Sequence, residues 1–189
     1  ERGGKTSAVL LEGVLERQLR KLNHIQYKGA QYPYSDANIL AGINALKEVP
    51  LQEGLMAANE TMYNLLTLGK SLEQAIEGDK KSYNLQYLDW KEWGQNVFHV
   101  TEEFRVQRAG SHDHYIPDLV LFVNGIPLAV IECKRPDMKN PLSEAISQHL
   151  RNQQEDGIRA LYVYAQITLS VATREAAYAT TATPDSLAH

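Results

Sequence analysis

In the first half of the chain, apolar residues recur three or four positions apart, as they do on the buried face of a helix. Pro50 interrupts this pattern and suits the start of a new helix. Residues 23–36 are rich in Tyr, Gln and Gly and are expected to form a loop. Helices are predicted over residues 7–22, 38–47, 51–68 and 71–77.

Short apolar segments typical of β-strands dominate the second half. Strands are predicted over residues 83–88, 97–106, 119–123, 128–131 and 167–171, and residues 176–180 are a candidate for another. Residues 161–164 fit either a strand or a helical turn. Asn140 and Pro141 predict the start of a helix that ends at Gly157. The stripe of this helix expected to be buried comprises Leu142, Ile146 and Leu150.

The order of these elements predicts the fold class. A helix, several antiparallel strands, a second helix and a further strand form an α/β sandwich, in which helices flank a central mixed sheet. The segment 38–77 is expected to add a helical layer. The length of 189 residues suits a single domain. Because the chain starts at Glu1 without a methionine, we expect it to be a fragment of a longer protein.

Asn124-Gly125 lies between two apolar segments and predicts a β-hairpin. Asp118 precedes the first strand, and Glu132-Cys133-Lys134 ends the second. The charged side chains of Asp118, Glu132 and Lys134 therefore meet at one end of the hairpin. A two-residue turn would place Asp118 and Glu132 on opposite faces. A three-residue loop, Val123-Asn124-Gly125, would place Asp118 diagonal to Glu132 on one face, and we predict this loop.

Such a cluster of charged residues has a specific chemistry. Two carboxylates, Asp118 and Glu132, together with the main-chain carbonyl of Cys133, would form an oxygen site suited to Mg²⁺, with Mn²⁺ as a second candidate. Lys134 would orient a water or stabilise negative charge on a phosphate. This combination predicts a phosphodiester hydrolase. The alternative is an ion network at the edge of a sheet.

Composition narrows the possible partners and location. The net charge of −4 predicts weak DNA binding by the isolated chain, because phosphate contacts require a locally basic surface. A single cysteine and no secretory signal pattern favour a reducing cytoplasm. Gly3-Gly4-Lys5-Thr6 lacks the earlier glycine and the preceding strand of a P-loop, so no ATP site is predicted in this chain.

The hairpin resembles a known nuclease signature. Pro117-Asp118 followed by Glu132-x-Lys134 is similar to the PD-(D/E)xK motif. The longer sequence D-L-V-L-F-V-N-G-I-P-L-A-V-I-E-C-K-R-P resembles the nuclease region of the restriction (R) subunit of type I restriction-modification enzymes. Residues 88–104 are similar to the segment that precedes this motif in that family, and the resemblance extends over residues 12–184.

The resemblance carries further expectations. It implies a restriction-endonuclease-like core and an endonuclease domain spanning residues 1–189 that cuts unmodified foreign DNA. It implies Gln148 and Glu12 as auxiliary residues, although Asn152 stands where related subunits carry a tyrosine. Arg135 and Lys139 are expected to contact double-stranded DNA. The complete subunit would add an ATP-driven translocating motor and work with methylase (M) and specificity (S) subunits. ATP and S-adenosylmethionine are therefore implied for the holoenzyme alone.

Two other functions are compatible with these residues. One is a non-catalytic module that keeps the fold and docks partners or guides DNA. The other is a repair or recombination nuclease that uses the same acid–acid–lysine chemistry. The intact set of Asp118, Glu132 and Lys134 favours an enzyme over the first, and the R-subunit-like surroundings favour restriction over the second.

Overall fold

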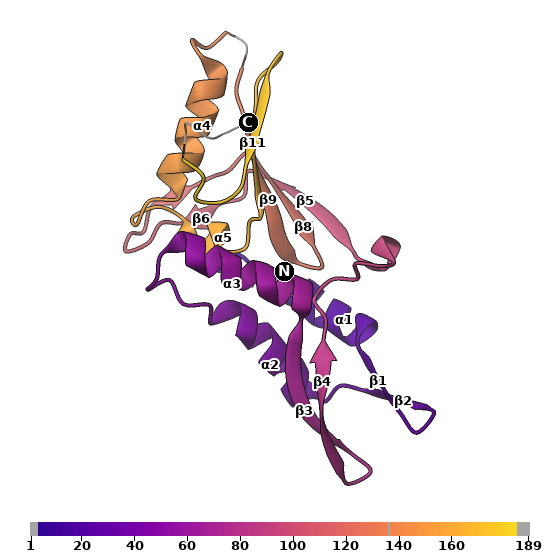
Figure 1. Cartoon of the computed structure of the whole chain (residues 1–189). Helices are drawn as coiled ribbons and strands as arrows, with labels where there is room; N and C mark the ends of the chain where they lie inside the picture. Colours follow the sequence, from indigo (N-terminus) through magenta and orange to yellow (C-terminus); the bar gives the residue numbers. More distant parts are fainter. Residues whose placement is uncertain (1–3, 136, 185–189) are drawn as a thin grey trace.

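A five-stranded mixed sheet forms the centre of the structure, a computed structural model that describes residues 4–135 and 137–184 (Figure 1). The strand order is β11-β10-β9-β8-β5, and only β9 and β10 run parallel among these neighbours. The strands are β5 Phe98–Glu102, β8 Leu119–Val123, β9 Ile126–Cys133, β10 Ile167–Val171 and β11 Ala176–Ala179. Gly3 of the P-loop-like segment and Pro136 of the hairpin motif lie outside the described residues.

Helices flank this mixed sheet, with α4 packed against β9, β10 and β11, which agrees with the predicted α/β class. In Figure 1, α4 lies beside the upper part of the sheet, and α1, α2 and α3 gather near its lower end. Within the described part of the chain, none of the helices has both the length and the apolar character needed to cross a membrane. The helices are α1 Glu12–Leu22, α2 Asp36–Lys47, α3 Leu55–Leu68, the 3-10 turn η1 Trp93–Gln95, α4 Pro141–Asn152 and α5 Arg159–Tyr162.

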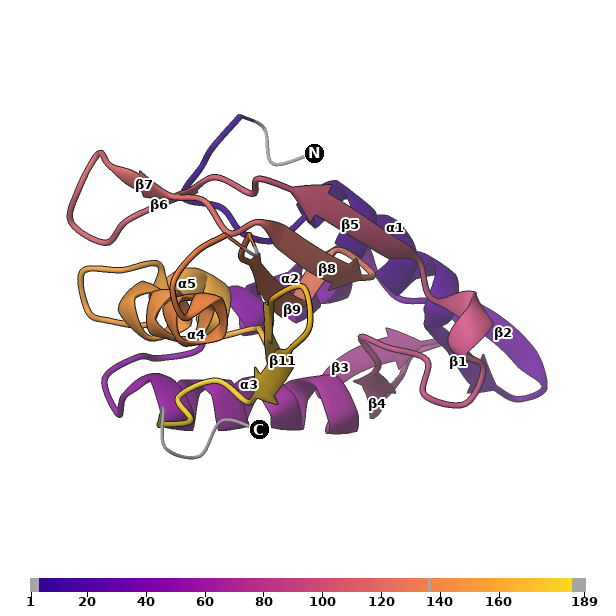
Figure 2. The same ribbon diagram turned by 90° about the horizontal axis from the view of Figure 1, so that it is seen from above.

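Among the described residues, three two-stranded ribbons accompany the sheet, and two of them correct the sequence prediction. The predicted loop over residues 23–36 contains a hairpin, and a strand, Lys70–Ile76, replaces the predicted helix over residues 71–77. Their turns, Lys28-Gly29 and Glu77-Gly78, have two consecutive positive φ angles, as a type I′ turn requires. Figure 2 shows the first ribbon projecting far from α4. The ribbons are β1 His24–Tyr27 with β2 Ala30–Pro33, β3 Lys70–Ile76 with β4 Asp79–Leu85, and β6 Val106–Gln107 with β7 His114–Tyr115.

The predicted strand over residues 97–106 is also interrupted. β5 ends at Glu102, and Glu103 has a φ angle of 48°, which is incompatible with a continuous strand. The backbone N–H of Glu103 instead donates to the carbonyl of Asp118 at 2.9 Å. This bond fixes the segment just before β8, where the first candidate acid lies.

The prediction of a three-residue loop between β8 and β9 is wrong. Val123 pairs with Ile126, so the turn contains Asn124 and Gly125 alone. Their φ angles are 52° and 83°, as in a type I′ turn. The buried Asn124 side chain holds the turn in place, because its Nδ2 donates to the Tyr87 carbonyl at 3.0 Å and its Oδ1 accepts from the Val97 N–H at 2.8 Å.

A β-bulge in β9 shifts the pairing of β8 with β9 by one residue, which the two-residue turn does not do. Phe122 pairs with Pro127, but Leu121 pairs with Ala129, so Leu128 is an extra residue without a partner across the ladder. Pro127 has no N–H to donate, and proline within a sheet is tolerated at bulges. The bulge therefore lies where the ladder is already weakened.

The bulge determines which face the two acids share. Leu119 pairs with Ile131, and extending this register by one residue sets Asp118 directly opposite Glu132. Directly opposite residues point to the same face of an antiparallel pair. The two acids thus reach the same face, as the sequence predicted, through a shift inside the strand and not through the loop.

The two faces of the sheet have different surroundings. Val120, Phe122, Val130 and Glu132 lie on the covered face and are buried. The other face is apolar but open: Phe98 is 58% exposed and Val100 62% exposed. A hollow of about 600 Å³ lies over this open face, beside α3. The candidate site lies at the edge of the covered face, where a charged group loses its contact with water.

Gly125 joins the hairpin to α1. Its carbonyl accepts a hydrogen bond from the Leu11 N–H at 2.9 Å, and a Cβ at this position would lie 2.6 Å from the Leu11 carbonyl oxygen. We therefore predict that Gly125→Ala lowers the free energy of unfolding by more than about 2 kcal/mol, because a left-handed conformation alone costs about 1 kcal/mol for alanine and the clash adds to it. Urea denaturation followed by circular dichroism measures this loss.

Gly29→Ala is the matched control. Gly29 has a similar φ of +81°, and no atom lies within 4 Å of its hypothetical Cβ. It should lose only the left-handed penalty of about 1 kcal/mol. Equal losses in the two variants would show that the approach of Leu11 does not constrain the turn.

Candidate functional site

Asp118 and Glu132 converge at the end of the β8–β9 hairpin. The two carboxyl groups are close enough to share a hydrogen bond. Asp118 also accepts a hydrogen bond from the backbone N–H of Cys133, with 2.6 Å between Oδ2 and N. Asp118 is half-buried, whereas Glu132 is fully buried. The cluster thus has one acid at the surface and one beneath it.

Both oxygens of the buried Glu132 carboxyl group are hydrogen-bonded by α4. Gln148 Nε2 donates to Oε2 at 2.6 Å, and Asn152 Nδ2 donates to Oε1 at 3.3 Å. Gln148 and Asn152 are four residues apart, so they lie on the same face of the helix. Helix α4 therefore holds Glu132 through two side-chain amides.

Lys134 joins the cluster through the same glutamine. Its backbone N–H donates to the Val171 carbonyl at 2.9 Å, which extends the pairing of β9 with β10. Its Nζ donates a short hydrogen bond to Gln148 Oε1. Gln148 therefore bridges Lys134 and Glu132, and the structure brings together four of the residues singled out from the sequence: Asp118, Glu132, Lys134 and Gln148.

The electrostatics of the cluster are unfavourable for Glu132 as an anion. Burial and, to a smaller extent, the nearby Asp118 carboxylate raise the pKa of Glu132, Lys134 opposes them, and the net value is about 8. A buried carboxylate beside a second carboxylate costs free energy unless a cation compensates it. A cation bound at this site would therefore offset the free-energy cost of ionising Glu132.

The described residues contain no cluster of three or more His, Cys, Asp or Glu side chains arranged to hold a metal ion. The hairpin end offers two carboxylates. Two carboxylates fit Mg²⁺, which commonly binds one or two of them and completes its shell with waters and substrate phosphates. The donor set is thus compatible with a metal that is shared between protein and substrate.

The remaining sequence-predicted residues lie around the cluster. Cys133 alternates with Glu132 and Lys134, and its side chain is exposed on the other face of β9. Arg135 and Lys139 are exposed, and Arg135 is paired with Asp137 at 3.5 Å. These two cations project near the start of α4. The carbonyl of Cys133 as a metal ligand, and both cations as DNA contacts, stay predictions.

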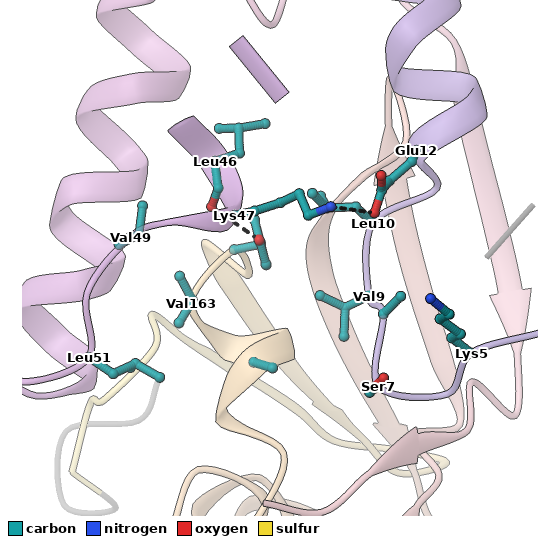
Figure 3. A pocket seen from close by; sticks show the side chains of 13 residues that line it. Lys5, Ser7, Val9, Leu10, Glu12, Leu46, Lys47, Val49, Leu51 and Val163 are labelled. Atoms are coloured by element: carbon teal, nitrogen blue, oxygen red, sulfur yellow. Dashed lines mark hydrogen bonds and ion pairs between the residues drawn. The ribbon is translucent and has the colours of Figure 1, made fainter. Parts of the chain in front are cut away.

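Glu12 is not brought to this cluster. It lies at the start of α1, next to the hairpin turn, and six residues of β9 separate that turn from Glu132, a span of roughly 20 Å at the rise of a strand. Glu12 instead pairs with Lys47 at 3.0 Å. Figure 3 shows this pair on the wall of a separate pocket of about 400 Å³, together with Val163 and Leu51.

Helix α4 turns a different face to the sheet than its apolar residues predict. Leu142, Ile146 and Leu150 are only partly buried, whereas Ala145, His149 and Asn152 are buried. The helix also ends at Asn152, before Gly157, and Asn140 adopts a left-handed conformation without a side-chain cap. No sequence signal marks His149 or Tyr162 as functional. Tyr162 is ten residues beyond Asn152 and contacts it through the fold.

A mixed α/β domain with an acid pair and a lysine at one hairpin end is thus defined by its structure alone. Comparison with known proteins now identifies its family. The chain belongs to the family described as "Type I restriction enzyme R protein N terminus", which matches residues 1–186. The resemblance to the R subunit of type I restriction enzymes, inferred from the hairpin sequence, is confirmed.

Individual relatives agree with this assignment. The chain is 30% identical over 164 residues to the type I restriction enzyme HindI endonuclease subunit of Haemophilus influenzae, which covers 86% of this chain and 14% of that protein. It is 31% identical over 155 residues to the putative type I restriction enzyme MjaVIIIP endonuclease subunit of Methanocaldococcus jannaschii. This match covers 81% of this chain and 14% of that protein. The chain therefore spans about one seventh of the length of these curated relatives.

The raised pKa of Glu132 predicts a pH-dependent stability. Between the ordinary carboxyl pKa of 4.5 and the folded value of about 8, the folded protein retains a proton that the unfolded chain has released. The metal-free protein should therefore lose stability as the pH rises through this window, by an amount on the order of 4 kcal/mol. Urea denaturation between pH 4.5 and pH 8.5, without divalent ions, measures this loss.

Glu132→Gln is the comparison, because glutamine does not ionise. Its free energy of unfolding should fall much less over the same window. The buried His149, whose pKa is lowered chiefly by burial, affects both proteins alike and cancels in the difference. Parallel pH profiles for the two proteins would contradict the assignment of a raised pKa to Glu132.

Proposed function

We propose that this chain is a metal-dependent endonuclease domain that hydrolyses phosphodiester bonds in DNA. The observation that carries the proposal is the buried Glu132 carboxyl group. It lies beside Asp118, and Gln148 links it to Lys134 through two hydrogen bonds. The family assignment supports it, since the relatives are named as endonuclease subunits of type I restriction enzymes. In this proposal the sheet and α4 form a PD-(D/E)xK core.

Each residue of the cluster has a distinct role in the proposed reaction. Asp118 and Glu132 would hold Mg²⁺, or Mn²⁺ in its place, with the Cys133 carbonyl as a further ligand. The metal would lower the pKa of a bound water and neutralise charge on the phosphate. Lys134 would orient the attacking water or stabilise the transition state. Gln148 would keep the lysine and the glutamate at a fixed separation, because it is bonded to both.

DNA binding by this chain is proposed to be weak. The net charge is −4, and the exposed cations near the site include Arg135 and Lys139. Most non-specific affinity for DNA comes from cations that neutralise phosphates. We therefore propose that the rest of the R subunit, with an ATP-driven motor, and the M and S subunits deliver unmodified foreign DNA to this domain.

The alternatives predict different behaviour. A docking or DNA-guiding module would not need a carboxylate buried against a second acid, which lowers stability without a cation. A repair or recombination nuclease would share the chemistry, but the family match favours the restriction system. The nuclease domain of an R subunit therefore accounts for more of the observations than either alternative.

Single substitutions test the catalytic assignment. We expect Asp118→Ala, Glu132→Ala and Lys134→Ala each to reduce cleavage of plasmid DNA at least about 100-fold in the presence of Mg²⁺ or Mn²⁺, because each removes a metal ligand or a charge that acts in the transition state. Gel analysis of plasmid nicking and linearisation measures the rate. Calorimetric titration with Mg²⁺ should show loss of binding in Asp118→Ala.

The control is Glu73→Ala, which removes an exposed acid from the β3–β4 ribbon, where Glu73 pairs with Lys80. This variant should cleave DNA and bind the metal as the parent does. Circular dichroism checks that each variant is folded. Cleavage at the parental rate by all three cluster variants would remove the nuclease assignment from this site.

A further inference from the structure

A buried hydrogen-bond network lies behind Glu132 and involves residues from α4, α5 and β10. We propose that Asn152, Tyr162 and His149 are positioning residues that hold Glu132 as an acceptor carboxylate facing the metal site. This inference rests on the proposed function. It assigns to Tyr162 and His149 a part in metal binding, although neither touches the metal site itself.

The direction of each hydrogen bond follows from the β10 end of the network. The carbonyl of Leu169 can only accept, so His149 Nε2 carries a proton and donates to it at 2.9 Å. In a neutral imidazole, Nδ1 must then accept, and it lies 2.9 Å from the Tyr162 hydroxyl. Tyr162 therefore donates its only proton to His149, and its oxygen is left to accept.

The same direction continues to Glu132. Asn152 Nδ2 has two protons and lies 3.5 Å from the Tyr162 oxygen and 3.3 Å from Glu132 Oε1. Both neighbours can accept, so the amide nitrogen is the group that faces them. The network thus fixes the orientation of the Asn152 amide and directs an N–H to Glu132.

Gln148 applies the same constraint to the other oxygen. The ammonium of Lys134 can only donate, so Gln148 turns its Oε1 to Lys134 and its Nε2 to Glu132 Oε2. Two amides, each oriented by a neighbour of fixed polarity, therefore present N–H donors to the two oxygens of one carboxyl group. When a cation compensates the charge of Glu132, this arrangement complements the ionised carboxylate, which accepts at both oxygens.

The turn between α4 and α5 places Tyr162 beside Asn152. The Ile158 N–H donates to the Asn152 carbonyl at 2.8 Å. A Cβ on Gly157 would lie 2.4 Å from the same carbonyl oxygen, so the chain can approach this closely only with glycine. Tyr162 is 0% exposed and His149 4% exposed, so the network is shielded from water that could replace its bonds.

Tyr162→Phe in the 189-residue chain tests the inference, because it removes one hydroxyl and keeps the ring. We expect Mn²⁺ to bind about 10-fold more weakly to this variant, as is typical when a residue that orients a metal ligand is lost. Isothermal titration calorimetry with Mn²⁺ as the probe measures the affinity. Asn152→Leu, which removes the donor at similar volume, should weaken binding by at least as much.

Tyr164→Phe is the matched control. Tyr164 is also buried, and its hydroxyl donates to the Leu46 carbonyl at 3.1 Å, in a different part of the core. Both tyrosine variants should lose similar stability in metal-free urea denaturation. Only Tyr162→Phe should lose Mn²⁺ affinity, and Tyr164→Phe should remain within about 2-fold of the parent. A purely structural role for Tyr162 would not produce this difference.

The outcomes separate this inference from the proposed function. If the parent protein does not bind Mn²⁺, or if Glu132→Gln binds it as the parent does, both the proposed function and this inference are overturned. Binding that depends on Glu132 but is unchanged in Tyr162→Phe and Asn152→Leu leaves the metal site in place and overturns the network. If Tyr162→Phe does not fold, Asn152→Leu decides between the same outcomes.

Discussion

The buried carboxyl group of Glu132 is the constraint on which the rest of the site depends. A carboxylate removed from water needs a hydrogen-bond donor for each oxygen and a nearby positive charge. Helix α4 supplies the donors through Gln148 and Asn152. The neighbouring Asp118 has the same sign of charge and increases the cost. The protein thus stabilises the position of Glu132 while Lys134 compensates its charge only in part, which is the condition that favours binding of a cation.

The sequence allowed part of this arrangement to be predicted. The apolar segments around Asn124-Gly125 indicated the hairpin, and the period of two along a strand placed Glu132 and Lys134 on one side. The apolar pattern alone did not show whether the loop or the strand contains the one-residue shift. Pro127 was the available sign, since a residue without an N–H weakens the ladder at that point.

Helix α4 shows why the supporting residues were missed. Apolar periodicity assigns polar side chains to the solvent, and here it selected Leu142, Ile146 and Leu150 as the buried stripe. His149 and Asn152 are buried instead, because their hydrogen-bond partners come from β10 and α5. Such partners are distant in the sequence, so they become visible only in the folded chain. The ribbons β1–β2 and β3–β4 were missed for a local reason, because their turns lack the Asn-Gly or Asp-Gly pairs that mark a hairpin.

The two ends of the β8–β9 hairpin have separate tasks. At the turn, Asn124 and Gly125 are fixed by the loop before β5 and by α1, so the hairpin has little freedom to slide. At the opposite end, Asp118 lies outside β8 and Glu132 lies inside β9, which gives one accessible acid and one buried acid. Because the buried acid is enclosed by α4, the accessible side of the proposed metal site is the side of Asp118. In the proposed function, a phosphate would therefore approach from the end of the sheet, near Arg135 and Lys139, and not across either of its faces.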